Sequence, residues 1–137
     1  MVGIVIAIIW FIVIMYLDVQ SDYKRIQTNS VKHGRGLAVR TAALLPSFGC
    51  LLFPLDNIQW WYILLKSFIV AGMLGAWWWE FFDGWLNTKR GYSWRYNGSD
   101  DEDDAKTDNF LQKYTPIQQM WIKWSLITIF TITYFLL

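Results

Sequence analysis

The most constraining feature of this sequence is a long apolar stretch from Trp60 to Phe82, which only Lys66 interrupts. Trp60 and Trp61 lie at its start and Trp77 to Trp79 near its end, about 27 Å apart at a helical rise of 1.5 Å per residue. A bilayer has a hydrocarbon core of about 30 Å, and tryptophan gathers at its two interfaces. The core helix of a soluble protein has no reason to space tryptophan clusters by this distance. The stretch therefore predicts a transmembrane helix over 60–82, with the helix continuing to about residue 87.

Three further apolar segments predict helices over 2–17, 37–53 and 117–137. The second contains Pro46, so a kinked or re-entrant helix is an alternative to a full crossing. Thr115 to Gln118 form a capping-box pattern with proline at the first helical position, which predicts the start of the last helix. We therefore expect an all-α fold, an integral membrane bundle of four transmembrane helices, forming a single domain over 1–137 with a cytoplasmic connection at about 86–115.

Composition agrees with lipid as the main solvent. Apolar residues make up 55% of the chain, and ten Trp, seven Tyr and nine Phe exceed what so small a soluble core would bury. The formal charge of +1 gives no reason to expect a nucleic-acid partner. Cys50 is the one cysteine, which excludes an intrachain disulfide, and we expect it to be a small apolar filler. No cofactor is expected, and the expected partners are membrane lipids, a second copy or a larger membrane complex.

Basic residues predict the orientation of the chain in the membrane. They fall in the first and third connections and are missing from the other extramembrane pieces: Lys24, Arg25, Lys32, Arg35, Lys89, Arg90, Arg95, Lys106 and Lys113. With four spans these two connections share one side, and the positive-inside rule makes that side cytoplasmic. Both termini are then expected outside. A re-entrant second segment would instead place the two basic connections on opposite sides.

The third connection divides into a basic aromatic part and an acidic part. The first part suits an interface with anionic lipid head groups through Lys89, Arg90, Trp94, Arg95 and Tyr96. Ordinary cytoplasmic loop composition is the alternative explanation of the same residues. The acidic run from Asp100 to Asp104 predicts a solvated turn, a contact for a partner, or the start of a helix.

A polar cluster is predicted at the cytoplasmic interface. Glu80, Asp83 and Asn87 are spaced i, i+3 and i+7 and share one helix face, while His33 and Arg40 approach the same level from the second helix. Arg40 is the expected partner of Glu80 or Asp83 because charged groups beside lipid need compensation. One hypothesis is a structural contact between these helices. The other is a divalent metal site formed by Glu80, Asp83 and His33, although one histidine and two acids are a weak metal signal.

Small residues on the third helix predict close helix packing. Gly72 and Gly75 would allow another helix, perhaps from a second copy, to approach closely. Lys66 and Lys123 lie near the starts of their helices, and we expect both ammonium groups to reach the interface along their flexible stems.

A set of positions resembles small, uncharacterised multi-spanning membrane proteins of bacteria and bacteriophages: His33, Arg40, Trp79, Asp83, Asn87, Arg90, Gly91, Trp94, Tyr96 and Gly98. The resemblance covers roughly residues 30–105 and implies no known activity. The leading expectation is a structural or interaction role, as a subunit of a membrane assembly or a phage or bacterial membrane component. One alternative is a metal-dependent interface enzyme acting on a lipid or phosphate substrate, and another is a holin-like pore.

Overall fold

The structure, a computed structural model, describes residues 2–28, 33–52, 59–96 and 113–137, with the side chains of 33–39 excepted. These residues form four α-helices and no strand, as expected for an all-α fold. The helices are α1 (Val2–Gln27), α2 (His33–Leu52), α3 (Trp60–Lys89) and α5 (Pro116–Leu136). The predicted run from Asp100 to Asp104 lies outside the described residues.

Helix α1 continues ten residues beyond the predicted end of its apolar segment at Leu17. The extension from Asp18 to Gln27 is polar, so hydropathy gave no sign of it. Lys24 and Arg25 occupy the last helical turn, where cations interact favourably with the helix dipole. Thr28 ends the helix by donating its backbone N–H and its hydroxyl to the carbonyl of Lys24, both at 3.1 Å.

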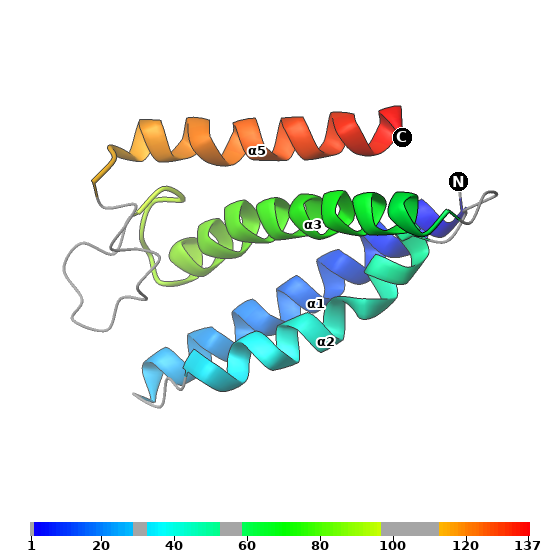
Figure 1. Ribbon diagram of the computed structural model, residues 1–137. Helices are drawn as coiled ribbons and strands as arrows, with labels where there is room; N and C mark the ends of the chain where they lie inside the picture. Colours follow the sequence, from blue (N-terminus) through cyan, green and yellow to red (C-terminus); the bar gives the residue numbers. More distant parts are fainter. Residues whose placement is uncertain (1, 29–32, 53–58, 97–112) are drawn as a thin grey trace.

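Helix α2 begins at His33, four residues before the predicted start, and runs through Pro46 as one helix. Proline at a helix interior lacks the backbone donor and clashes with the preceding turn, which bends the axis. The second half of α2 accordingly turns toward α3 (Figure 1).

Helix α3 is 30 residues long and ends in a defined glycine cap. Gly91 has φ 82°, a left-handed conformation that glycine adopts without strain. The N–H of Tyr92 donates to the carbonyl of Asn87 at 3.0 Å and that of Gly91 to Thr88 at 3.1 Å, which is the Schellman arrangement. The predicted start at residue 60 is confirmed, although the suggested caps, Asp56 and Asn57, lie outside the described residues.

Helix α5 starts with the predicted capping box. The Thr115 hydroxyl accepts from the N–H of Gln118 at 3.3 Å, and the Gln118 side chain accepts from the N–H of Thr115 at 2.9 Å. Pro116 takes the first helical position, where its missing N–H costs nothing.

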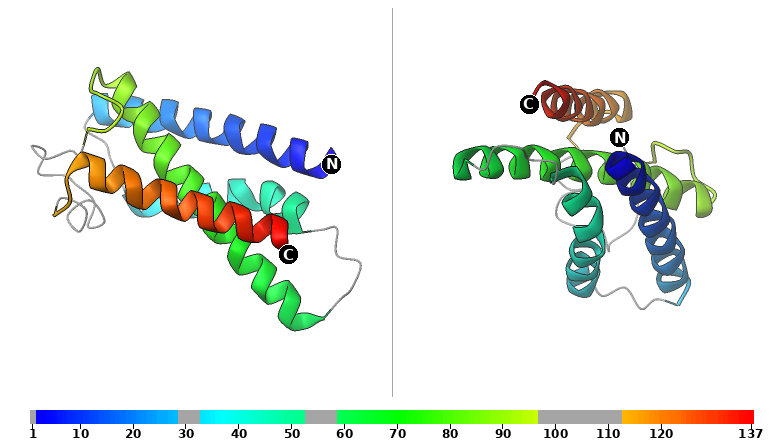
Figure 2. Two further views of the ribbon diagram at one scale, coloured as in Figure 1. Left: turned by 90° about the horizontal axis from the view of Figure 1, so that it is seen from above. Right: turned by 90° about the vertical axis from the view of Figure 1, so that its right-hand side faces the viewer.

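The four helices form two antiparallel pairs with α3 in the middle. Figures 1 and 2 show α5 on one side of α3 and the α1–α2 pair on the other. The chain ends near residues 2 and 137 lie at one end of the bundle. The end of α1, the start of α2, the end of α3 and the start of α5 lie at the opposite end.

Close contacts fix each pair. Ser47 of α2 is fully buried and donates its hydroxyl to the carbonyl of Ala7 on α1 at 3.1 Å. Between α3 and α5, a Cβ added at Gly72 would lie 2.4 Å from the Phe130 ring. Gly72 therefore lies in close contact with α5 of the same chain. Gly75 has no atom within 4 Å of such a Cβ.

Two of the described helices, α1 and α3, are long and apolar enough to cross a membrane. In their apolar windows only 22% and 28% of residues are buried. In the part of α2 whose side chains the structure describes, Arg40–Leu52 form a shorter apolar segment. Exposed large side chains remain on the outer faces, among them Ile9 (58%), Phe68 (69%) and Trp121 (64%).

Candidate functional site

The charged side chains of the described helices gather mainly at the end of the bundle opposite the chain termini. Three groups lie there: a cluster on α1 and α2, an ion pair between α3 and α5, and a turn that folds back over α3. Each is built by a local feature of the sequence.

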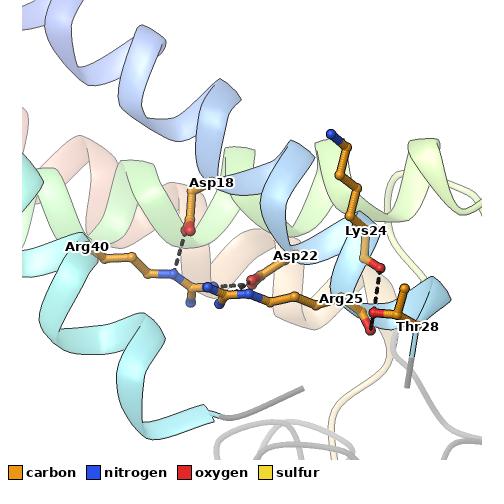
Figure 3. A network of polar contacts seen from close by, with 6 residues as sticks. All are labelled: Asp18, Asp22, Lys24, Arg25, Thr28 and Arg40. Atoms are coloured by element: carbon orange, nitrogen blue, oxygen red, sulfur yellow. Dashed lines mark hydrogen bonds and ion pairs between the residues drawn. The ribbon is translucent and has the colours of Figure 1, made fainter. Parts of the chain in front are cut away.

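The first group, the Arg40 cluster, consists of Arg40 of α2 with Asp18 and Asp22 of α1 (Figure 3). The Arg40 Nε lies 2.5 Å from the Asp18 carboxylate, and one of its terminal nitrogens pairs with Asp22. Asp18 and Asp22 are spaced i, i+4, so both carboxylates face α2 from one side of α1. Arg25 adds a longer contact to Asp22 at 3.4 Å.

The same guanidinium reaches the middle helix. Its central carbon lies 4.5 Å from the centre of the Phe82 ring, a cation–π contact with α3. Phe82 stacks on Trp78 at 5.6 Å, and Trp78 meets Phe11 of α1 edge to face at 5.9 Å. Arg40 thus connects three helices, through charge to α1 and through an aromatic face to α3.

The predicted pairing of Arg40 with Glu80 or Asp83 is wrong. The helical extension of α1 brings Asp18 and Asp22 beside α2, and these carboxylates pair with the Arg40 guanidinium. Because the apolar segment ends at Leu17, hydropathy alone did not place Asp18 and Asp22 on a helix. The missed signal is the i, i+4 spacing of two acids directly after an apolar helix.

The second group is an ion pair between Asp83 of α3 and Lys123 of α5. The Lys123 ammonium lies 2.8 Å from the Asp83 carboxylate and 4.8 Å from the centre of the Trp79 ring. The side chain of Lys123 is only 11% exposed. From the sequence we expected Lys123 only to reach toward the interface. In the structure its ammonium also joins the last helix to α3.

The third group is the Trp94 turn, residues 90–96, which folds back along the end of α3. The indole N–H of Trp94 donates to the Glu80 carboxylate at 3.3 Å. The Asn87 amide donates to the carbonyls of Trp94 at 3.3 Å and Tyr96 at 2.9 Å. A Cβ at Gly84 would lie 1.9 Å from the Trp94 ring, so only glycine permits this approach. Glu80 and Asn87 are each 8% exposed.

Basic and aromatic residues follow the outer side of the Trp94 turn. Tyr92 and Tyr96 stack with ring centres 4.1 Å apart, and the Arg90 guanidinium lies 5.0 Å from the Tyr92 ring. Arg95 is exposed. Lys89 donates to the side-chain oxygen of Gln20 on α1 and lies 5.4 Å from the Tyr23 ring. The residues predicted for a head-group interface therefore lie together, with Trp94 turned inward toward Glu80.

The predicted cluster is divided among these three groups. Glu80 faces the Trp94 turn, Asp83 faces α5, and Arg40 faces α1, while the side chain of His33 lies outside the described residues. Among the side chains that the structure describes, no group of three His, Cys, Asp or Glu residues could hold a metal ion.

Lys66 lies toward the other end of α3 and is 8% exposed. Its ammonium lies between two rings, 5.8 Å from the centre of Tyr62 and 5.5 Å from that of Tyr134. Tyr134 donates its hydroxyl to the Leu51 carbonyl at 3.2 Å, which ties α5 to the end of α2. The expected exposure of this lysine at an interface is therefore not observed.

Comparison of the chain with family models, with curated proteins and with solved structures found no match. The class of protein that the described residues define is an all-α bundle with two helices capable of crossing a membrane. Any function therefore has to be argued from the contacts above.

Proposed function

We propose that this chain is a small multi-pass membrane protein with a structural or interaction role, as a subunit of a larger membrane assembly or as a phage or bacterial membrane component. The observation that supports the proposal is that charged side chains on different helices pair with one another. Arg40 pairs with Asp18 and Asp22, and Asp83 pairs with Lys123. Such pairing compensates charge beside lipid and holds helices together.

The apolar surface supports the membrane part of this proposal. The core helix of a soluble protein is mostly buried, whereas the apolar windows of α1 and α3 are 22% and 28% buried. Exposed apolar residues recur along three helices, for example Leu17 (56%), Leu64 (62%) and Phe135 (69%). Water penalises such a surface, and lipid does not.

We propose that α2 and α5 cross the membrane together with α1 and α3. Helix α5 has 21 residues and spans about 32 Å, enough for a hydrocarbon core of about 30 Å. Helix α2 has 20 residues and contacts α1 through Arg40 and Ser47. The α1–α2 connection and the α3–α5 connection leave the helices at the same end of the bundle (Figure 1). This arrangement supports a topology in which both basic connections share one side.

The enzyme alternative needs Glu80, Asp83 and His33 to converge on one ion. Glu80 and Asp83 contact different partners, Trp94 and Lys123, which favours the structural role for both. The pore alternative needs a free small-residue face on α3. Phe130 of the same chain covers Gly72, which weakens that alternative too.

Two measurements on native membranes test the proposal. Alkaline carbonate should leave the full chain in the membrane pellet, and its release into the supernatant would contradict a multi-pass protein. Extraction in lipid nanodiscs should then yield a particle larger than one 16.2 kDa chain with its lipid shell. A lone monomer that binds one divalent ion per chain would instead support the enzyme.

A further inference from the structure

We infer that the end of the bundle beside the Trp94 turn binds the anionic head groups of phospholipids in the same bilayer, through Lys24, Lys89 and Arg95. This inference rests on the proposed membrane location and adds a partner to it. The three side chains are exposed and come from two helices and the turn between α3 and α5.

The first argument is the distance of these residues from the ends of the apolar segments. Lys24 follows the end of the first apolar segment, Leu17, by as many residues as Lys89 follows Phe82. Both therefore lie about 10 Å beyond the hydrocarbon edge along their axes. Head groups occupy this layer, and lysine reaches back along its stem to meet phosphate.

A contact between α1 and α3 holds the basic ends of these two helices side by side. Lys89 donates to Gln20 and lies 5.4 Å from the Tyr23 ring, so the end of α3 is next to the polar extension of α1. Lys24 lies four residues after Gln20 on that extension and therefore shares its helix face. The basic residues of α1 and α3 therefore form one surface rather than two separate ones.

The carboxylates that the structure describes already have cationic partners or a donor. Asp18 and Asp22 pair with Arg40, Asp83 pairs with Lys123, and Glu80 accepts from Trp94. Within the part of the chain that the structure describes, Lys24, Lys89 and Arg95 have no carboxylate partner. These three exposed side chains are therefore available to an external anion.

Aromatic rings complete the match to a lipid interface. The Tyr92–Tyr96 stack lies on the same turn as Arg95, and Tyr23 lies beside Lys89. Rings with a polar edge favour the head-group region, where each basic residue favours an anionic surface about fivefold. These rings would not favour the binding of a small anion from water.

The test uses the full chain reconstituted in phosphatidylcholine bilayers with spin-labelled phosphatidylglycerol or phosphatidylcholine as probe. We expect the first probe to be motionally restricted by the protein several-fold more than the second in dilute salt. The ratio of restricted phosphatidylglycerol to restricted phosphatidylcholine should fall toward one in molar salt, because screening shortens the range of the interaction. The triple variant K24Q/K89Q/R95Q should lose the preference, whereas K24R/K89R/R95K keeps the charge and should retain it.

Two outcomes would overturn the inference: equal restriction of both probes by the wild-type chain, or a preference that survives the loss of the three charges. Equal helicity of the variants by circular dichroism excludes unfolding as the cause of a loss, and the salt series on the wild type tests the inference without any variant. If the chain fails to enter the bilayer at all, the proposed membrane role fails instead.

Discussion

Arg40 connects α2 with both α1 and α3. It pairs with two carboxylates of α1 and stacks on Phe82 of α3. Replacing it in Arg40→Gln leaves Asp18 and Asp22 close together without their counter-charge. Because the cluster is partly exposed, we expect a loss of about 1–3 kcal/mol in unfolding free energy. Denaturation of the chain in mixed detergent micelles measures this loss.

Arg25 offers a matched control for Arg40. It reaches only Asp22, at 3.4 Å, and its side chain is 40% exposed. Arg25→Gln should therefore change stability by less than about 0.5 kcal/mol. Adding Asp18→Asn and Asp22→Asn to Arg40→Gln should recover part of the loss, since the repelling charges are gone. Equal effects of the two arginine substitutions would contradict the bridging role of Arg40.

Gly84 permits the Trp94 turn to fold back on α3. A methyl group in Gly84→Ala would overlap the Trp94 ring, at 1.9 Å from its nearest atom. We expect the ring to leave this position, the indole bond to Glu80 to break, and trypsin to cleave faster after Arg90 and Arg95. The cost should be about 1–3 kcal/mol.

Gly49 of α2 is the control for Gly84, because an added Cβ there meets nothing within 4 Å. Gly49→Ala should leave both the cleavage rate and the stability close to those of the natural chain. An unchanged cleavage rate in Gly84→Ala would show that the turn does not depend on contact with this glycine.

Residue contacts could be predicted from the sequence where spacing along one helix decides them. Glu80 and Asn87 were expected on one face of α3, and both contact the Trp94 turn from there. The partner of Arg40 could not be predicted, since it depended on how far α1 continues past Leu17. The role of Trp94 also required the positive φ of Gly91, which turns the chain back.

At the scale of elements, the contact between α3 and α5 depends on the small residue at position 72. Gly72→Leu would place a side chain where Phe130 lies, 2.4 Å from its ring. We expect a loss of about 1–3 kcal/mol in unfolding free energy and separation of α5 from α3. Cross-linking between cysteines placed on the two helices measures this separation.

Gly75 lies one turn further on the same helix and meets nothing within 4 Å. Gly75→Ala should be neutral or stabilising by up to about 1 kcal/mol, because glycine is a poor helix former. If Gly75→Leu instead changed the particle size in nanodiscs while Gly72→Leu did not, a second copy would have to pack on this face. That result would revive the predicted contact between copies.

Helix bounds could be predicted where the sequence carries a chemical signal at the end. The capping box at Thr115 and the tryptophan pair at residues 60 and 61 each lie at an observed helix start. The C-terminal end of α1 carries only the basic residues Lys24 and Arg25 in its last turn, which is a weaker signal than a capping box. The polar extension of α1 carries the two carboxylates that pair with Arg40, and a hydropathy pattern contains no information on that contact.

At the scale of the whole molecule, the fold gives a reason for the distribution of charge along the chain. The two pairs, α1–α2 and α3–α5, join at the same end of the bundle (Figure 1). The basic residues described at that end include Lys24, Lys89, Arg95 and Lys113. A membrane protein retains such residues on the cytoplasmic side.

The topology therefore predicts which cysteines an impermeant maleimide reaches in intact cells. In a Cys50→Ala background, Gln27→Cys and Lys113→Cys should be labelled only after the cells are opened, because the proposed topology places both connections in the cytoplasm. Val2→Cys and Leu136→Cys should be labelled from outside. All four positions are exposed, so burial does not prevent the reaction. If α2 only dipped into the membrane, Gln27→Cys and Lys113→Cys would react from opposite sides, and an odd number of spans would replace the four proposed here.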